Sequence, residues 1–363
     1  MKGGCNSRPQ TASLQSVAGR FQKRLLSPVV RAVALISSAS IHRTHNIMKT
    51  MYVSLALLLL LAGPAVFRAA QQWSSGASQQ DHVAATAQQS NVTTDGLSCS
   101  RFEWDSDKTV MKVPISLDGK LYWYQLDTGA DVVIPYGSIK HEGWSARGSA
   151  VRIPNVRFAG MFFPSILGYP NKDMPLDPSN PTDPKGTVGL ELLIGHTFVI
   201  DFPKRRICLL ERADLPESLT HEADWSPAEI RHGKLFVDVA LNGQKLDGIL
   251  YDTGSSSDAL CVDLSLWKEA TGRSGTKDAT THTSGQSWGR ELEIIGAPAS
   301  GELKIGKHVY QRPLMTTVPA QPEVYRTEYR AQGLLGNALF AGSIIILDLG
   351  AHPSFGIIDS RPR

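Results

Sequence analysis

The chain has 363 residues, with 37 Lys and Arg against 34 Asp and Glu and a formal net charge of +3 at pH 7. The charge is uneven, because residues 1–70 hold nine basic residues and no acidic one, so that the remainder carries 28 basic and 34 acidic residues and a net charge of −6. A protein that binds nucleic acid normally keeps its positive charge on the folded surface, so a nucleic-acid-binding core is disfavoured. The 42% of hydrophobic residues and 20% of charged ones exclude a chain that is disordered throughout.

The amino-terminal segment predicts export. Residues 51–67 (MYVSLALLLLLAGPAVF) form a long apolar run that is flanked by Lys49 and Arg68. Its core, residues 53–62, has the length of the apolar region of a signal peptide, and the whole run lies at the short limit for a membrane span. The sequence therefore predicts an exported protein, periplasmic or extracellular, which is either released by cleavage or attached to a membrane through residues 51–67. Residues 1–50 are a basic leader that is long for a signal peptide, and Met48 or Met51 is the expected natural start.

Residues 68–105 are rich in Gln, Ser, Ala and Thr and predict a polar linker. One of the four cysteines lies in the leader, which leaves Cys99, Cys208 and Cys261 in an oxidising compartment. One disulfide and one spare thiol are expected there, and the sequence leaves their assignment open. The spacing of the cysteines and histidines fits no metal site, so we expect neither a metal nor another cofactor.

One motif occurs twice in the chain. Asp127-Thr128-Gly129 and Asp252-Thr253-Gly254 each follow a predicted strand, an Asp-Gly or Asn-Gly hairpin turn and a second predicted strand. Downstream, residues 186–202 align without a gap with residues 333–349, so that glycines, apolar pairs and a terminal Asp coincide. The sequence therefore predicts one fold that is used twice.

Short β-branched and aromatic segments between Gly, Pro and Asn turns fill most of the remaining chain, which is typical of β-strands. The predicted strands are residues 110–115, 121–126, 151–162, 235–241, 291–295, 303–305 and 344–349. One short helix is expected at 264–270, closed by Gly272. The expected fold is all-β, with an amino-terminal lobe over residues 106–215, a joint over 216–228 and a carboxyl-terminal lobe over 229–363.

A single D-T-G triplet carries little weight, because about 0.1 copies are expected by composition in a chain of this length. Two copies in matching contexts are far harder to attribute to chance. The region resembles the aspartic peptidases of the pepsin and retropepsin superfamily, through the two triplets and through Val188-Gly189 and Leu334-Leu335-Gly336, which look like the hydrophobic-hydrophobic-Gly element of each lobe. The resemblance implies two pseudo-symmetric, acid-protease-like β-barrel lobes with the active-site cleft between them, and a peptide or protein substrate.

The resemblance makes Asp127 and Asp252 the catalytic pair. Two carboxyls within hydrogen-bonding distance share a proton, so one can accept a proton from water while the other donates to the scissile carbonyl. Gly129 and Gly254 are the residues that let the backbone approach these carboxylates closely.

Three hydroxyls are expected to support the catalytic loops. The resemblance implies that Thr128 and Thr253 brace the two loops against each other. It also implies that Ser255 donates to the outer oxygen of Asp252, whereas Ala130 offers no such hydroxyl in the first half. Loss of one donor raises the pKa of a carboxyl, so activity is expected at mildly acidic to near-neutral pH.

The sequence between the first triplet and Val151 contains no hairpin with the tyrosine that pepsins place over the cleft. We expect the cover to come from residues 281–305, read as two strands around the Gly-Ala-Pro-Ala-Ser-Gly turn, with Trp288 as a candidate for substrate binding. Trp288 can instead pack in the core. Trp144 is an equal candidate for substrate binding. The basic triplet at residues 204–206 follows a turn and is interpreted as a solvated hairpin rather than an anion site.

Two other classes of function compete with an endopeptidase. A catalytically silent peptide-binding protein would keep the cleft, but binding alone would not require both aspartates. A glycosidase would hold its two carboxyls about 5–9 Å apart around a sugar, which is farther than two paired D-T-G loops would place them. Because both lobes lie in one chain, we expect a monomer.

Overall fold

The computed structural model describes residues 94–359, except for residues 106–108, 131, 138–142, 173, 175–182, 288–289 and 321–330. The predicted leader, the apolar run at 51–67 and most of the predicted linker lie outside the described residues. The chain divides into two units, Met1–Ala84 and Ala85–Arg363, and the description below concerns the second. None of the helices in the described part is long and apolar enough to cross a membrane.

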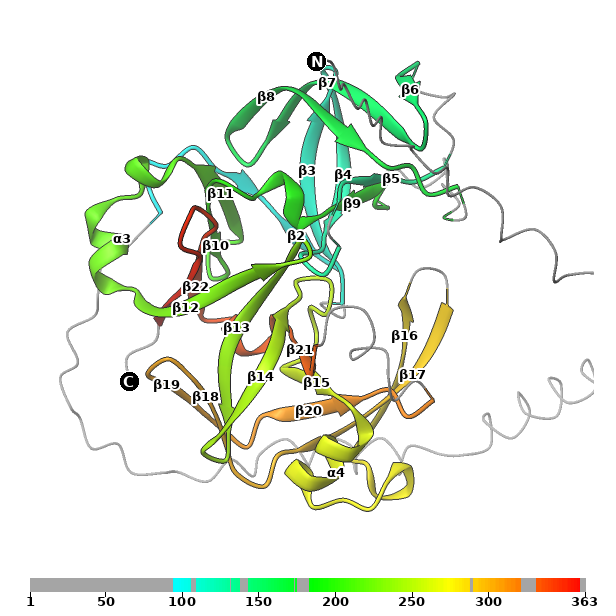
Figure 1. The fold of residues 1–363 in the computed structure, drawn as a ribbon, viewed down its shortest axis with the longest axis vertical. Helices are drawn as coiled ribbons and strands as arrows, with labels where there is room; N and C mark the ends of the chain where they lie inside the picture. The colour runs from blue at the N-terminus through cyan, green and yellow to red at the C-terminus, as the bar shows by residue number, and fades with distance from the viewer. Residues whose placement is uncertain are drawn as a thin grey trace, which may run out of the picture. The chain divides into compact units, whose positions relative to one another are not determined.

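The fold is all-β with two lobes that repeat one plan, as predicted (Figure 1). The first lobe is an eight-stranded sheet with the order β5-β9-β4-β3-β7-β6, in which β2 pairs with β3 and β8 pairs with β7. Its strands are β2 (Glu103–Trp104), β3 (Met111–Leu117), β4 (Lys120–Leu126), β5 (Ile134–Pro135), β6 (Ser145–Arg147), β7 (Ala150–Phe158), β8 (Met161–Gly168) and β9 (Gly186–Val188).

The second lobe repeats this plan with a longer sheet that starts at β12 (Asp224–Arg231) and has the order β12-β13-β14-β21-β15-β20-β17-β16, in which β18 pairs with β13 and β19 pairs with β18. Its elements are β13 (Lys234–Leu241), β14 (Gln244–Tyr251), β15 (Leu260–Val262), α4 (Leu264–Thr271), β16 (Thr281–Ser287), β17 (Arg290–Pro298), β18 (Glu302–Ile305), β19 (His308–Gln311), β20 (Leu314–Thr317) and β21 (Gly333–Leu335).

A further part of the sheet contains strands from both halves of the chain. It has the order β1-β11-β10-β22-β23-β12, and it joins the second lobe because β12 pairs first with β23 and then with β13. The residues are β1 (Ser100–Arg101), β10 (Thr197–Asp201), β11 (Arg206–Leu210), β12 (Asp224–Arg231), β22 (Ser343–Asp348) and β23 (Ser354–Asp359). The repeated segments meet here, since β10 and β22 pair directly, with Val199 opposite Ile346.

Four short helical segments connect these strands. They are η2 (Leu190–Leu192), η3 (Arg212–Asp214), η4 (Thr276–Asp278) and η5 (Ala338–Phe340), and α3 (Glu217–Glu222) leads into β12. Helix α4 begins where Asp263 accepts a hydrogen bond from the Leu266 amide, and it ends at Gly272, whose φ of 67° is left-handed. The predicted helix is therefore confirmed to within one residue at its carboxyl end.

The two hairpin turns that precede the D-T-G triplets have the predicted form. Asp118-Gly119 joins β3 to β4 with φ values of 47° and 80°, and Asn242-Gly243 joins β13 to β14 with φ values of 52° and 79°. Positive φ at both central residues is the geometry of a type I′ turn, which Asp-Gly and Asn-Gly favour. The same local chemistry therefore starts both halves of the repeat.

Two strand predictions were wrong in detail. Residues 151–162 do not form one strand, because the chain turns at Ala159-Gly160, with φ values of 49° and 94°, to give the β7–β8 hairpin. The predicted turn around residues 296–301 also begins too early. Gly296 and Ala297 remain in β17 because they pair with β20, and the hairpin of β16 and β17 instead reverses between Ser287 and Arg290. In the first case a turn with left-handed φ values interrupts the predicted strand. In the second case pairing with β20 overrides the local turn preference.

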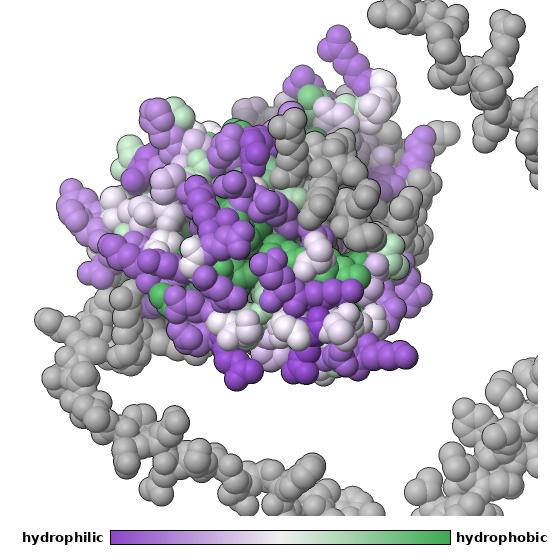
Figure 2. Space-filling view, turned by 60° about the horizontal axis from the view of Figure 1, so that its bottom comes forward, coloured by the Kyte–Doolittle hydropathy of each residue, from purple (hydrophilic) through white to green (hydrophobic). Residues whose placement is uncertain are grey.

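The core follows the strand period of two. In β3 the side chains of Met111, Val113, Ile115 and Leu117 are buried and alternate with partly exposed ones. On the face drawn in Figure 2, polar side chains cover most of the described surface and apolar ones are visible in a central band. Large apolar side chains are thus mainly inside the lobes.

The segment before β1 is fastened to the β10–β11 hairpin. Cys99 and Cys208 form a disulfide with their Cα atoms 4.3 Å apart, and Cys261 is a buried thiol. Asp95 accepts from Lys204 at 3.0 Å and from Arg206 at 2.8 Å. The pairing that the sequence left open is thereby assigned, and the basic triplet at 204–206 contacts a carboxylate of this chain.

Candidate active site between the lobes

The two catalytic candidates occupy equivalent positions at the ends of equivalent strands. In the first lobe β4 pairs in parallel with β9, and the Asp127 amide donates to the Val188 carbonyl at 3.0 Å. In the second lobe β14 pairs in parallel with β21, and the Asp252 amide donates to the Leu335 carbonyl at 2.9 Å. The hydrophobic-hydrophobic-Gly elements identified in the sequence are therefore the strands that fix the two aspartates.

The glycines that follow these strands let the chain cross closely behind each D-T-G loop. A Cβ on Gly189 would lie 2.2 Å from the Val132 carbonyl oxygen, and one on Gly336 would lie 2.0 Å from the Ser255 carbonyl oxygen. No side chain larger than hydrogen fits at either position without a shift of the backbone. The repeat thus encodes the same packing twice.

The two aspartates meet where the loops of the two lobes come together. Their carboxyl groups are hydrogen-bonded to each other. Each also faces the glycine of the opposite loop: a Cβ on Gly129 would lie 2.6 Å from Asp252 Cγ, and a Cβ on Gly254 would lie 2.7 Å from Asp127 Cγ. Glycine in the triplet is therefore required by the carboxyl of the other lobe.

The threonines of the two triplets hold the loops together. The Thr128 amide donates to Thr253 Oγ1 at 2.9 Å, and the Thr253 amide donates to Thr128 Oγ1 at 3.0 Å. The Thr128 hydroxyl in turn donates to the Tyr251 carbonyl at 2.8 Å. Both threonine side chains are fully buried. This reciprocal bracing has the geometry that the sequence led us to expect.

Burial dominates the electrostatics of the pair. It raises the pKa of Asp127, although hydrogen bonds from Asp252 and from the Ala130 amide and the charge of Lys234 act in the opposite direction. It raises the pKa of Asp252 well above its ordinary value, and the negative charge of Asp127 raises it further, while the Gly254 amide, at 2.8 Å, lowers it. Like charges this close cannot both ionise cheaply. Burial and the neighbouring charge therefore favour a pair that keeps a proton.

Ser255 does not have the partner that the resemblance implied. Its hydroxyl donates to Asp258 Oδ2 at 2.9 Å, and Asp258 Oδ1 accepts from the Thr316 hydroxyl at 3.0 Å. A hydroxyl has one proton to donate, so the proton of Ser255 is committed to Asp258. The physical cause is the third carboxyl, which lies three residues along the same loop.

Sequence reasoning missed four residues at this site. Asp258 and the buried Lys234 place charges beside the pair, while Tyr136 packs close to Asp127 and bonds Thr187 Oγ1 at 2.6 Å. Asn337, fully buried, accepts from the Tyr251 hydroxyl at 2.9 Å. The signals available were weak: a lysine opening an apolar strand and a polar residue following the Leu-Leu-Gly element.

Of the two tryptophan candidates, Trp144 is among the described residues and Trp288 is not. Trp288 lies outside the described residues, so its predicted role in substrate binding stays a prediction. Trp144 is partly buried and packs against the core of the protein. Within the described part of the chain, no group of three or more His, Cys, Asp or Glu side chains is placed to hold a metal ion.

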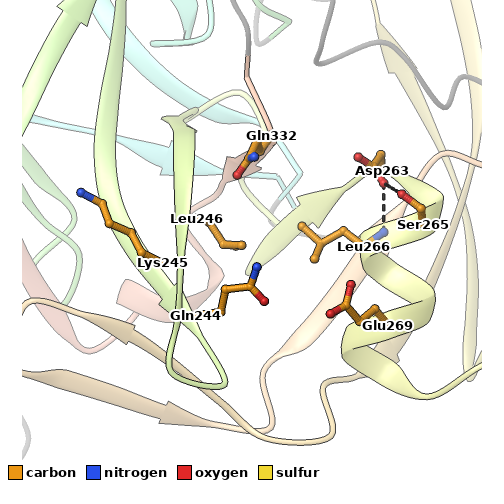
Figure 3. A pocket seen from close by; sticks show the side chains of 8 residues that line it. All are labelled: Gln244, Lys245, Leu246, Asp263, Ser265, Leu266, Glu269 and Gln332. Carbon is orange, nitrogen blue, oxygen red and sulfur yellow. Dashed lines mark hydrogen bonds between the residues drawn. The ribbon is translucent and has the colours of Figure 1, made fainter.

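A separate polar hollow lies on the second lobe, between the start of β14 and the amino-terminal end of α4 (Figure 3). Lys245 and Glu269 are among its lining residues, and neither belongs to the D-T-G loops. The Asp263 carboxylate, which also lines the hollow, caps helix α4. It accepts hydrogen bonds from the Leu266 amide at 2.9 Å and from the Ser265 hydroxyl at 2.5 Å. This carboxylate is therefore already engaged at the start of the helix.

No protein-family model matches the chain, and no curated protein matches it. Among solved structures it is similar to the basic 7S globulin from soybean, with 10% sequence identity and a TM-score of 0.41 over 73% of this chain and 95% of that one. It is also similar to conglutin gamma, a basic 7S globulin from lupine seeds, with 11% identity and a TM-score of 0.43 over 73% and 95% of the two chains.

Proposed function

We propose that the protein is an aspartic-type endopeptidase that hydrolyses peptide bonds with a water molecule activated between Asp127 and Asp252. The observation that carries the proposal is the hydrogen-bonded carboxyl pair, to which each lobe contributes one equivalent loop. A buried pair that shares one proton contains a base and an acid side by side, which is what the hydrolysis of an amide requires.

In the proposed reaction, the ionised carboxylate accepts a proton from the water as its oxygen attacks the carbonyl carbon. The protonated carboxyl donates its proton to the carbonyl oxygen at the same stage, which gives a tetrahedral diol. Collapse of the diol breaks the C–N bond, the leaving nitrogen takes up a proton from the pair, and a hydroxyl proton returns to the pair. One water is consumed, the pair regains its single proton, and no bond forms between substrate and enzyme.

The pKa shifts support activity at mildly acidic to near-neutral pH. Burial raises the pKa of both carboxyls, and the negative charge of Asp127 raises that of Asp252 further. The active state needs one proton on the pair, and this state ends when the second carboxyl ionises. A raised pKa for that carboxyl extends the active range upward in pH.

The alternative proposal is a catalytically silent protein that binds peptides. It would retain the fold, but it gives no reason for two buried carboxyls to be held together at a cost in desolvation. A glycosidase fits less well, because direct hydrogen bonding of the two carboxyls is closer than the roughly 5–9 Å that sugar hydrolysis uses.

We further propose that the enzyme acts outside the cytoplasm as a monomer on peptide or protein substrates. The Cys99–Cys208 disulfide supports an oxidising compartment. Both aspartates come from one chain, so no second copy is needed to complete the pair.

The test is digestion of a peptide library by the purified chain between pH 3 and 8, alongside Asp127→Asn and Asp252→Asn. Asp238→Asn serves as the matched control, because that carboxylate is exposed and pairs with Lys245 on the surface. The expected result is cleavage by the wild type and the control but by neither dyad variant. Cleavage that survives either dyad substitution would remove the proposed mechanism.

A further inference from the structure

Lys234 is a buried lysine that reaches from one lobe into the catalytic loop of the other. It is the first residue of β13 in the second lobe, and only 4% of its surface is exposed. Its ammonium donates a hydrogen bond to the carbonyl oxygen of Gly129, in the D-T-G loop of the first lobe. A buried ammonium is costly unless other groups compensate its charge, so this placement requires a compensating environment.

That environment is the pair of aspartates. The positive charge of Lys234 lowers the pKa of both Asp127 and Asp252, and so acts against the desolvation that raises them. Gly129 directly follows Thr128 in the loop, so the lysine contacts the backbone that carries the first aspartate. The cation is thus held by a neutral carbonyl at a point where its field reaches both carboxyls.

The other ionisable groups near the pair do not supply this positive charge. Tyr136 faces Asp127, while Tyr251 and Asp258 face Asp252, and burial raises the pKa of all three. These groups are either neutral or negative.

On the strand next to β13, Arg231 lies opposite Lys234, but its Nε pairs with Glu229 at 3.2 Å. Its guanidinium also lies 3.8 Å from the ring centroid of Phe236. Among these groups, Lys234 is therefore the cation whose field bears on the carboxyl pair.

We propose that Lys234 is a positioning residue that keeps one carboxyl of the Asp127–Asp252 pair ionised in its water-poor site and fixes the first catalytic loop to the second lobe through the Gly129 carbonyl. Its consequence for catalysis rests on the proposed function, whereas its effect on the ionisation of the pair does not. If Lys234 only held the two lobes together, its removal would change the free energy of unfolding but not the pH at which the pair ionises.

The direct test is a titration of the aspartyl carboxyls by 13C NMR in the full chain, with Asp127→Asn and Asp252→Asn used to assign the pair. Lys234→Met, which removes the charge and keeps most of the side-chain length, is expected to move the first ionisation of the pair upward by about one pH unit. Lys234→Arg is expected to restore the wild-type titration. Lys245→Met removes a charge from an exposed lysine on the neighbouring strand and is expected to leave the titration unchanged.

A titration of the pair that is identical in wild type and in folded Lys234→Met would overturn the proposal. If that variant does not fold, the wild type alone tests the proposal. The 15Nζ resonance of Lys234 is expected to shift as the aspartyl pair ionises, and a resonance that stays constant through that pH range would overturn the proposal.

Kinetics then separate this inference from the proposed function. In an active enzyme, Lys234→Met is expected to shift the acid limb of the kcat/KM profile upward by the same amount as the NMR titration. If the carboxyl titration moves as expected but the wild type cleaves no peptide, Lys234 keeps its role and the endopeptidase proposal fails. An acid limb that remains in place while the protein is active contradicts the role of Lys234.

Discussion

The hydroxyl of Ser255 donates a hydrogen bond to Asp258, 2.9 Å away, although the catalytic candidate Asp252 lies on the same loop. The second loop thus contains a third buried carboxyl, which also accepts from Thr316 on β20. Burial raises the pKa of Asp258, and the negative charge of Asp252 raises it further. The two halves of the repeat therefore differ in charge next to their aspartates.

Asp258→Asn tests this difference. Removing a negative charge near Asp252 favours its ionised form, so the pKa of Asp252 falls and the basic limb of the kcat/KM profile moves to lower pH. The expected shift is up to about one pH unit, because the two carboxyls interact at short range inside the protein. Asp278→Asn, at an exposed carboxylate of the same lobe, is the control and should leave the profile in place. A basic limb that moves upward would contradict the assignment.

The carboxyl pair also makes stability depend on pH. The folded-state pKa of Asp252 lies above the ordinary value of 3.8, so the folded protein binds this proton more tightly than the unfolded chain. The contribution to the free energy of unfolding is full below the unfolded pKa and is lost as the pH rises through the folded one.

Asp252→Asn removes this titration and is expected to raise the Tm at pH 7–8 by several degrees, since about 1 kcal/mol corresponds to about 2–4 °C in a protein of this size. The gain should vanish near pH 3, where the wild-type carboxyl is protonated in both states. Calorimetry of both proteins across this range checks the sign, and a variant that is less stable than wild type at pH 8 would be inconsistent with a buried, repelled carboxyl.

Gly129→Ala is expected to abolish activity and leave a folded protein. The added methyl would lie 2.6 Å from the Asp252 carboxyl, so the two aspartates can no longer share a proton without a shift of the loop. We expect a fall in kcat/KM of at least about 100-fold, which corresponds to about 2.7 kcal/mol. Gly350→Ala, whose methyl would lie 3.3 Å from an oxygen of the partly buried Asp348, is the matched control. Comparable activity in the two variants would exclude close contact between the loops.

The repeated features of the site could be predicted from the sequence, because each depends on a local motif that occurs once in each half of the chain. The Asp-Gly and Asn-Gly turns, the D-T-G triplets and the glycines at 189 and 336 recur at matching positions, and the structure brings these segments together. Because the fold is pseudo-symmetric, comparing one half of the sequence with the other identifies these residues.

The asymmetric features could not be predicted in this way. Lys234 and Asp258 have no counterpart in the other half, and each acts through a contact to a different element: Gly129 in the opposite lobe and Thr316 on β20. The misplaced turn near residue 296 has the same origin, since Gly296 remains in its strand by pairing with Thr316. Such contacts depend on the tertiary fold rather than on local sequence.

Tyr251 and Asn337 provide a test of how much this asymmetry contributes to stability. They occupy the positions of Leu126 and Leu190 in the first lobe, which are fully buried apolar residues. In the second lobe the Tyr251 hydroxyl donates to Asn337 Oδ1 at 2.9 Å, and Asn337 Nδ2 donates to Ser256 Oγ at 2.8 Å and to the Thr253 carbonyl at 3.3 Å. The network lies directly behind the second D-T-G loop.

Asn337→Leu should destabilise the protein by about 2–4 kcal/mol, because it leaves the buried hydroxyl of Tyr251 without its acceptor. Tyr251→Phe should cost about 1–2 kcal/mol, since only the buried amide oxygen loses a donor. The double variant is expected to be more stable than the sum of the single losses by about 1 kcal/mol or more, because both partners of the bond are then absent. Urea unfolding of the four proteins measures this coupling. Strict additivity would show that the hydrogen bond contributes nothing, and the second loop would then tolerate the apolar support that the first loop already has.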